Sequence, residues 1–155
     1  MRRKDREIID KKIIEEIIFK SQIIRLGFID EQEVYIVPLN YGVRFNEQIT
    51  FYFHSASVGR KIDCIKKNPY VGFEVDTNFK INEGEIACEY SARFQSVIGN
   101  GKIEFIEEYH EKEEALNIIM EHYTESSSWK YNKDMIERVC VFKLVVEKCS
   151  CKEHK

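Results

Sequence analysis

The sequence is poor in the features that mark several large classes of protein. It has only two prolines in 155 residues and no low-complexity tract, which argues against a long disordered or fibrous segment. Its net charge of -3 argues against a dedicated nucleic-acid-binding domain. No window is apolar enough to span a membrane, and no apolar stretch follows the basic start to form a secretion signal. We therefore expect an ordinary globular chain of one domain, 1–155, without nucleic-acid or membrane partners.

Several motifs of catalytic, nucleotide and metal sites are also missing. There is no G-x-S-x-G nucleophile motif and no glycine-rich phosphate loop, because Gly99-Asn100-Gly101 lies inside a strand pattern and predicts a bulge. The five cysteines are odd in number and scattered, which predicts reduced thiols and a cytoplasmic location. Cys149, Cys151 and His154 form a C-x-C-x-x-H pattern, but structural zinc usually takes four ligands. We predict no metal site.

The hydrophobic pattern predicts many short strands interrupted by helices. Strands are expected at 22–30, 34–43, 49–54, 70–75, 90–106 and 140–148. Helices are expected after Asp10, over 58–67, through 113–123 and around 133–139, with a basic arm at 1–9 and a tail at 149–155. The inward face of the third helix is predicted as Leu116, Ile119, Met120 and Tyr123, and its histidines His110 and His122 as surface residues. This order is typical of an antiparallel barrel or α+β fold rather than of a doubly wound sheet.

The stretch FYFHSASVGRKIDCIKKNP, 51–69, predicts a strand, a loop and then a helix. Its helix opens with Arg60 and Lys61, although the helix dipole already makes that end positive. A phosphate held by these cations, by the first-turn N–H groups and by the hydroxyls of Ser55 and Ser57 would resolve the conflict. Alternatively, both cations extend into water and Ser57 is an ordinary N-cap.

Four segments in order resemble one known group of proteins. They are RLGF (25–28), VPLNY (37–41), FYFHSASVGRKIDCIKKNPYVGFEV (51–75) and QSVIGNGKIEFIE (95–107). Together they resemble the FMN-binding split-barrel proteins, most of all the nitroimidazole-resistance (Nim) and pyridoxamine 5'-phosphate oxidase-related group. The resemblance implies a mainly β (α+β) fold, an antiparallel split β-barrel with flanking helices. It also implies a homodimer with one FMN in each of two clefts at the subunit interface.

The same resemblance implies a set of cofactor-binding residues. Ser55, Arg60 and Lys61 would hold the FMN phosphate, next to Ala56 in the same block. The isoalloxazine would lie along Pro38, Leu39 and Asn40, with His54 close to the ring as the candidate catalytic residue. Gln95 and Ser96 match a strand that usually contributes from the other subunit.

Two further features of the sequence allow more than one interpretation. Trp129, the only tryptophan, could stack on a flavin or a substrate, or cover an edge of the core. A polar row at period two, opposite an apolar row, could line a cofactor site or face solvent. The polar row is Ser91, Arg93 and Gln95, and the apolar row is Ala92 and Phe94.

The resemblance leads to two hypotheses about function. In the first, the chain is an FMN-dependent oxidoreductase that passes electrons from NADH or NADPH to a small acceptor such as a nitroaromatic or a quinone. In that case the cofactor carries the redox chemistry, which fits the lack of an acid–base constellation. In the second, it is a non-catalytic flavin- or haem-binding protein of the same fold. His54 would either serve the reaction as a proton donor or only hydrogen-bond the strand end.

Overall fold

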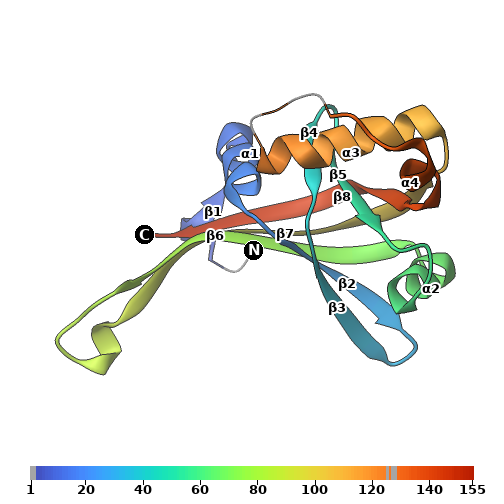
Figure 1. Cartoon of the computed structure of the whole chain (residues 1–155). Coiled ribbons are helices and arrows are strands. Elements are labelled where there is room, and N and C mark those ends of the chain that lie inside the picture. The colour runs from blue at the N-terminus through green and yellow to red at the C-terminus, as the bar shows by residue number, and fades with distance from the viewer. Residues whose placement is uncertain (1–2, 125, 127–128) are drawn as a thin grey trace.

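An antiparallel sheet forms the centre of the computed structural model, which describes residues 3–124, 126 and 129–155 (Figure 1). Over these residues the sheet has eight strands in the order β3-β2-β6-β7-β8-β5-β4, and β1 pairs with β8. The strands are β1 (Glu7–Ile8), β2 (Ile24–Asp30), β3 (Glu33–Leu39), β4 (Gly42–Phe45), β5 (Ile49–Ser55), β6 (Tyr70–Asn82), β7 (Ser91–Ile106) and β8 (Cys140–His154). The helices are α1 (Lys11–Lys20), α2 (Arg60–Lys67), α3 (Tyr109–Tyr123) and α4 (Lys133–Arg138), with 3-10 turns at Lys4–Arg6 and Ala87–Glu89.

The barrel is split between β3 and β4, which follow each other in the chain but lie at opposite ends of the strand order. The single strand predicted over 34–43 is therefore wrong, because the chain breaks at Asn40 and Tyr41. Tyr41 is fully buried, and its hydroxyl donates hydrogen bonds to the carbonyls of Ile18 and Ser21 at the end of α1. This anchor turns the backbone from one sheet edge to the other. The expected split-barrel fold is confirmed.

The core fills the barrel as the alternation of apolar residues predicts. In β2, Leu26 and Phe28 lie on one face and are buried, whereas Arg25 lies on the other face and is exposed. Helix α1 contributes Ile17 and Ile18, which are also fully buried. Other members of the same core cluster are Phe51, Phe53, Phe73, Val75, Val97, Phe142 and Leu144.

Helix α3 packs against the sheet with a different face from the predicted one. It begins at Tyr109, and its buried residues are Lys112, Ala115, Ile118, Ile119 and His122. Of the predicted inward residues, only Ile119 is buried, and the expected surface position of His122 is wrong. Its Nε2 lies 2.9 Å from the carbonyl oxygen of Ser21, so the ring donates to a backbone group that α1 leaves without a helical partner. Burial lowers the pKa of His122.

Strands β6 and β7 extend together beyond the body of the sheet as a long hairpin arm, residues 76–94 (Figure 1). The strand predicted at 70–75 is thus too short, because β6 continues past a bulge between Thr77 and Lys80. The polar row is confirmed on one side of the arm, where Arg93 donates to Asn82 and Gln95 donates to Glu153. The predicted bulge at Asn100 and Gly101 is also present.

The two ends of the described chain form part of the same sheet. Strand β1 pairs with the last residues of β8, placing Ile8 opposite Cys151. Residues 149–154, treated above as a tail, continue β8 and pair with β7 as far as His154. No helix among the described residues is long and apolar enough to cross a membrane.

Candidate functional site

The predicted strand, loop and helix over 51–69 are confirmed as β5, residues 56–59 and α2. We call residues 55–61 the corner. Helix α2 begins at Arg60, two residues later than predicted, and its N-cap is Gly59 rather than Ser57. Gly59 has a φ of 121°, a conformation that residues with a Cβ rarely adopt, and no side chain caps the helix. The backbone conformation of Gly59 therefore determines how the first turn of α2 is oriented.

The first cation of the corner, Arg60, already has protein partners. Its guanidinium donates to Asp30 at 2.8 Å and to Glu33 at 2.6 Å, both on the β2–β3 hairpin. It also lies 4.4 Å from the ring centroid of Tyr35. The Arg60 hydrogen bond lowers the pKa of the Asp30 carboxyl, and the two carboxylates raise the pKa of Arg60. These acidic residues, rather than water, balance its charge.

The second cation, Lys61, is half-buried and is left without such a pair. Burial lowers the pKa of its ammonium, and the one neighbour that opposes this shift is the Cys140 thiol. Cys140 begins β8 directly opposite Ser55. No carboxylate among the described residues forms an ion pair with Lys61. Lys61 is therefore the cation of the corner that can accept an anionic ligand without first losing a partner.

His54 lies at the end of β5, opposite Val141, and points away from the sheet face that carries Phe53 and Ser55. It remains solvent-exposed. The part of the ring that the protein covers is desolvated, and this effect, followed by the nearby Lys61 charge, lowers its pKa. Because its pKa is lowered, the imidazole is mostly uncharged at neutral pH. Its protonated form, which can donate a proton, is populated at more acidic pH.

Three predicted contacts lie where the barrel is open. Pro38 and Leu39 end β3, which pairs only with β2 among the described strands, and Asn40 follows it. Leu39 packs partly against the core, whereas Pro38 and Asn40 are exposed. The outer backbone edge of β3 is thus available to a flat ligand.

The remaining predicted contacts lie away from the corner within one chain. Gln95 pairs with Glu153 near the end of β8, whereas Ser55 pairs with Cys140 at its start, so roughly 40 Å of strand separates the two positions. Ser96, next to Gln95, lies opposite Asp76 and Lys152. One chain cannot bring these residues to the corner. Trp129 is 40% exposed between α3 and α4, and Ala56 is exposed in the corner loop.

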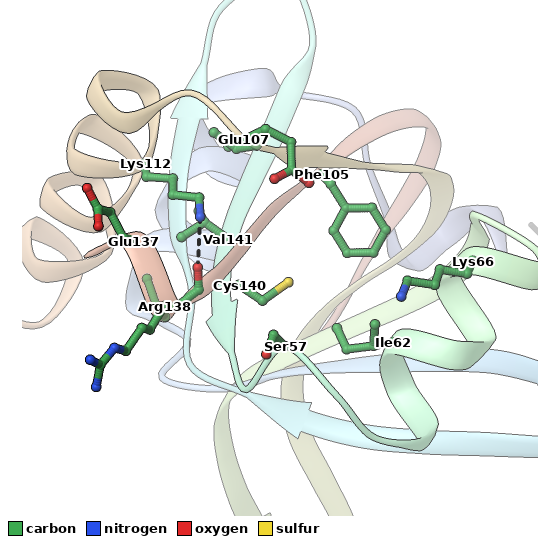
Figure 2. Close-up of a pocket in the computed structure, with 12 residues that line it drawn as sticks. Ser57, Ile62, Lys66, Phe105, Glu107, Lys112, Glu137, Arg138, Cys140 and Val141 are labelled. Atoms are coloured by element: carbon green, nitrogen blue, oxygen red, sulfur yellow. Dashed lines mark hydrogen bonds between the residues drawn. The ribbon is translucent and has the colours of Figure 1, made fainter. Parts of the chain in front are cut away.

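A cavity adjoins the corner between α2, the end of β7, the start of β8 and α4 (Figure 2). We call it the α2–α4 cavity. Its volume is about 230 Å³, and its wall includes Ile62, Phe105, Cys140 and Val141. Lys112 reaches it from α3 and donates to the carbonyl of Val139 at 3.0 Å. Figure 2 shows the Cys140 sulfur directed toward Ile62 and Phe105.

Comparison with protein-family models places the sequence in a known family. The model described as pyridoxamine 5'-phosphate oxidase matches residues 10–153, nearly the whole chain. The chain belongs to the pyridoxamine 5'-phosphate oxidase family. The family resemblance stated from the sequence is therefore confirmed. Comparison with curated protein sequences finds no match.

Solved structures place this family member close to a nitroimidazole-resistance candidate. A candidate 5-nitroimidazole antibiotic resistance protein from Bacteroides thetaiotaomicron is 35% identical, with a TM-score of 0.83 over 95% of this chain and 86% of that chain. The flavocytochrome Anf3 from Azotobacter vinelandii has a TM-score of 0.84 at 18% identity, over 100% of this chain and 72% of that one. An FAD and heme binding protein from Mycobacterium smegmatis has a TM-score of 0.82 at 10% identity, over 97% and 74%. The last two identities support the fold alone.

The sequence analysis missed two residues of this family member's site region, Lys112 and Cys140. Lys112 belongs to a stripe with Ala115, Ile119 and His122, spaced three and four residues apart, which is a helical face. This helical spacing was visible in the sequence, but the stripe contains both polar and apolar residues and so does not form an apolar face. Cys140 carried no signal, because its position depends on pairing with Ser55, 85 positions away along the chain.

Proposed function

We propose that the chain is an FMN-dependent oxidoreductase that passes electrons from reduced nicotinamide to a small acceptor such as a nitroaromatic or a quinone. The observation that carries the proposal is Lys61, a half-buried cation without a carboxylate partner among the described residues, next to the glycine-directed first turn of α2. A phosphate is the natural counter-ion for such a cation beside free N–H groups. The 35% identical resistance candidate supports the choice of acceptor.

The residues of the corner fit the phosphate of FMN. Lys61 would pair with it, and the Ser55 hydroxyl, which now donates to the Ala56 carbonyl at 2.7 Å, can turn toward it. Arg60 would orient the β2–β3 hairpin through Asp30 and Glu33 rather than bind the cofactor. The open edge of β3 at Pro38, Leu39 and Asn40 would support the ring. When bound, FMN supplies the transfer of electrons between donor and acceptor, which the protein's own side chains do not provide.

We also propose that the chain acts as a homodimer. The register places the exposed apolar residues of four adjacent strands on one sheet face, opposite the core. The hairpin arm continues this face with Ile81, which is 46% exposed. Arg25, Glu74 and Asp76 form ion pairs on the same face, so the exposed apolar residues lie around a charged centre, and a second chain could cover both. The residues of the face are Ile29 on β2, Val34 and Ile36 on β3, Tyr70 on β6 and Ile98 on β7.

A charge placed on the β7 side of this face is expected to separate the dimer. Ile98, on β7, is 55% exposed and lies opposite Glu74, which already pairs with Arg25. The Ile98→Lys variant should raise the dimer dissociation constant by about 100-fold or more, because each interface would then bury two added ammonium groups. Sedimentation equilibrium measures the shift. Met135→Lys on α4, a residue 71% exposed and outside the face, should leave the dimer intact. A wild-type monomer that binds FMN tightly would contradict the proposal.

His54 is proposed as the proton donor to the reduced acceptor. Its position at the end of β5 places an exposed imidazole directly before the corner, one residue from Ser55. Reduction of a nitro group or a quinone consumes protons, and a histidine can deliver one near neutral pH. Because its pKa is lowered, the charged donor form is present at acid pH and is lost as pH rises through a value below 6.5.

Rapid mixing can test both the reaction and this role. In the wild type, NADH or NADPH should reduce the bound flavin, and a nitroaromatic or quinone should reoxidise it, faster at acid pH. His54→Ala should slow reoxidation by about 100-fold and remove its pH dependence while leaving flavin reduction nearly unchanged. His110→Ala, at an exposed position on α3, is the matched control. Absence of both half-reactions with flavin bound would overturn the proposal in favour of a non-catalytic flavin-binding protein.

A further inference from the structure

Lys112 is a buried cation that the protein only partly satisfies. It is 8% exposed, on the inner face of α3, and its ammonium contacts the α2–α4 cavity. Within the described part of the chain it forms one hydrogen bond, to the Val139 carbonyl, although an ammonium has three N–H donors. Among the described residues no carboxylate forms an ion pair with it, and Glu137, on the same cavity wall, pairs instead with Lys133.

Buried charges in proteins are normally paired, because removing an ammonium from water without a counter-ion is costly. The cavity wall carries three cationic side chains, Lys66, Lys112 and Arg138, and two carboxylates, Glu107 and Glu137. Lys66 and Arg138 are exposed to water and Glu137 pairs with Lys133, so Lys112 is the buried charge of this wall that needs a counter-ion, and one negative charge supplies it. The chemistry of the wall therefore favours a monoanion.

The rest of the cavity fits an apolar body attached to that charge. Ile62, Phe105 and Val141 line it, and about 230 Å³ exceeds the roughly 150 Å³ of an apolar cavity that holds benzene. We propose that the α2–α4 cavity binds a small monocarboxylate with an aromatic or branched body, with its carboxylate on Lys112. This site goes beyond the proposed flavin function. It shares Ser57 with the corner, but its charge partner is Lys112 on α3 rather than Lys61.

Calorimetric titration of the purified protein, with whatever cofactor it carries, tests the proposal with benzoate and its neutral analogue benzamide. Benzoate should bind more tightly than benzamide. Lys112→Met should weaken benzoate by at least about tenfold, the loss expected for one charge-assisted hydrogen bond, and leave benzamide unchanged. Lys148→Met, which removes an exposed lysine near the far end of β8 and outside the cavity, should bind benzoate like the wild type. Equal binding of the two compounds, or equal benzoate affinity in Lys112→Met and wild type, would overturn the proposal.

A measurement on the wild type alone covers the case in which Lys112→Met fails to fold. Cys140 is on the cavity wall, whereas Cys149 is exposed near the far end of β8. Benzoate should slow iodoacetamide labelling of Cys140 severalfold but not that of Cys149, as read by peptide mass spectrometry, and benzamide should protect neither. Unchanged Cys140 labelling would reject the site. Flavin content and turnover of the same samples test the proposed function separately. The carboxylate site and the flavin-dependent function can therefore be rejected independently of each other.

Discussion

Replacing Lys61 with alanine is expected to lower the affinity for FMN by roughly 10- to 150-fold, the effect of losing one charge-assisted hydrogen bond of about 1.5 to 3 kcal/mol. Lys61 has no carboxylate partner among the described residues, so its charge is free for a ligand phosphate. Riboflavin, which lacks the phosphate, should bind the Lys61→Ala variant and the wild type equally. Titration followed by flavin fluorescence gives both affinities.

Arg60→Ala is the matched control, because it removes the neighbouring cation from the same helical turn. Its guanidinium is bonded to Asp30 and Glu33, so we expect FMN affinity to change by less than about threefold. If Arg60→Ala lowers FMN affinity as much as Lys61→Ala does, Arg60 must leave Asp30 and Glu33 to bind the phosphate. Unchanged FMN affinity in Lys61→Ala would show that the corner does not hold the phosphate.

The Gly42→Ala variant is expected to lose about 3 kcal/mol or more of folding free energy. A Cβ at Gly42 would lie 2.5 Å from the backbone of Ile118 and Ile119, because β4 passes directly against α3. Helix backbone cannot move aside as the end of a flexible side chain can. The helix or the strand must therefore shift, which disturbs the packing around Tyr41 and His122. Urea unfolding followed by circular dichroism measures the loss.

Gly72→Ala in β6 provides the comparison within the same sheet. There the added Cβ would meet only the Gly99 carbonyl oxygen at 3.8 Å, an ordinary contact. The expected change is below about 1 kcal/mol, the range of strand propensity. If the two alanine variants had equal stability, the close approach of β4 to α3 would not be a determinant of the fold.

Local patterns predicted much of this architecture, and they failed where distant residues decide the outcome. The hydrophobic pattern predicted a strand where β2 lies, and the sequence of 51–69 indicated strand, loop and helix correctly. It could not indicate that Arg60 pairs with Asp30 and Glu33, which are 30 and 27 residues away. The break after Asn40 likewise depends on Tyr41 reaching the end of α1, a contact that no short segment encodes.

Polar residues inside the protein caused the other errors. His122 and Lys112 are inward residues of α3 because each donates to a backbone carbonyl of another element, Ser21 and Val139. A prediction based on apolar residues alone therefore placed Leu116 and Met120 on the inward face of α3 and missed Lys112 and His122. The length of β6 was underestimated because its outer part carries Asn78 at a positive φ and polar side chains whose partners, Gln95 and Ser91, lie on β7.

The place of β8 in the sheet has a consequence for how the chain reaches this structure. β8 is the last strand to be synthesised, yet it lies between β7 and β5 and joins the β3-β2-β6-β7 part to the β5-β4 part. Until residues 140–154 emerge from the ribosome, the nascent chain can form two separate hairpin assemblies but cannot close the barrel. Folding that depends on such non-local pairing is slow and leaves strand edges exposed to aggregation. The corner at the end of β5 can become rigid only after residues 140–154 have been translated, so a flavin would be captured only once the whole sheet can form.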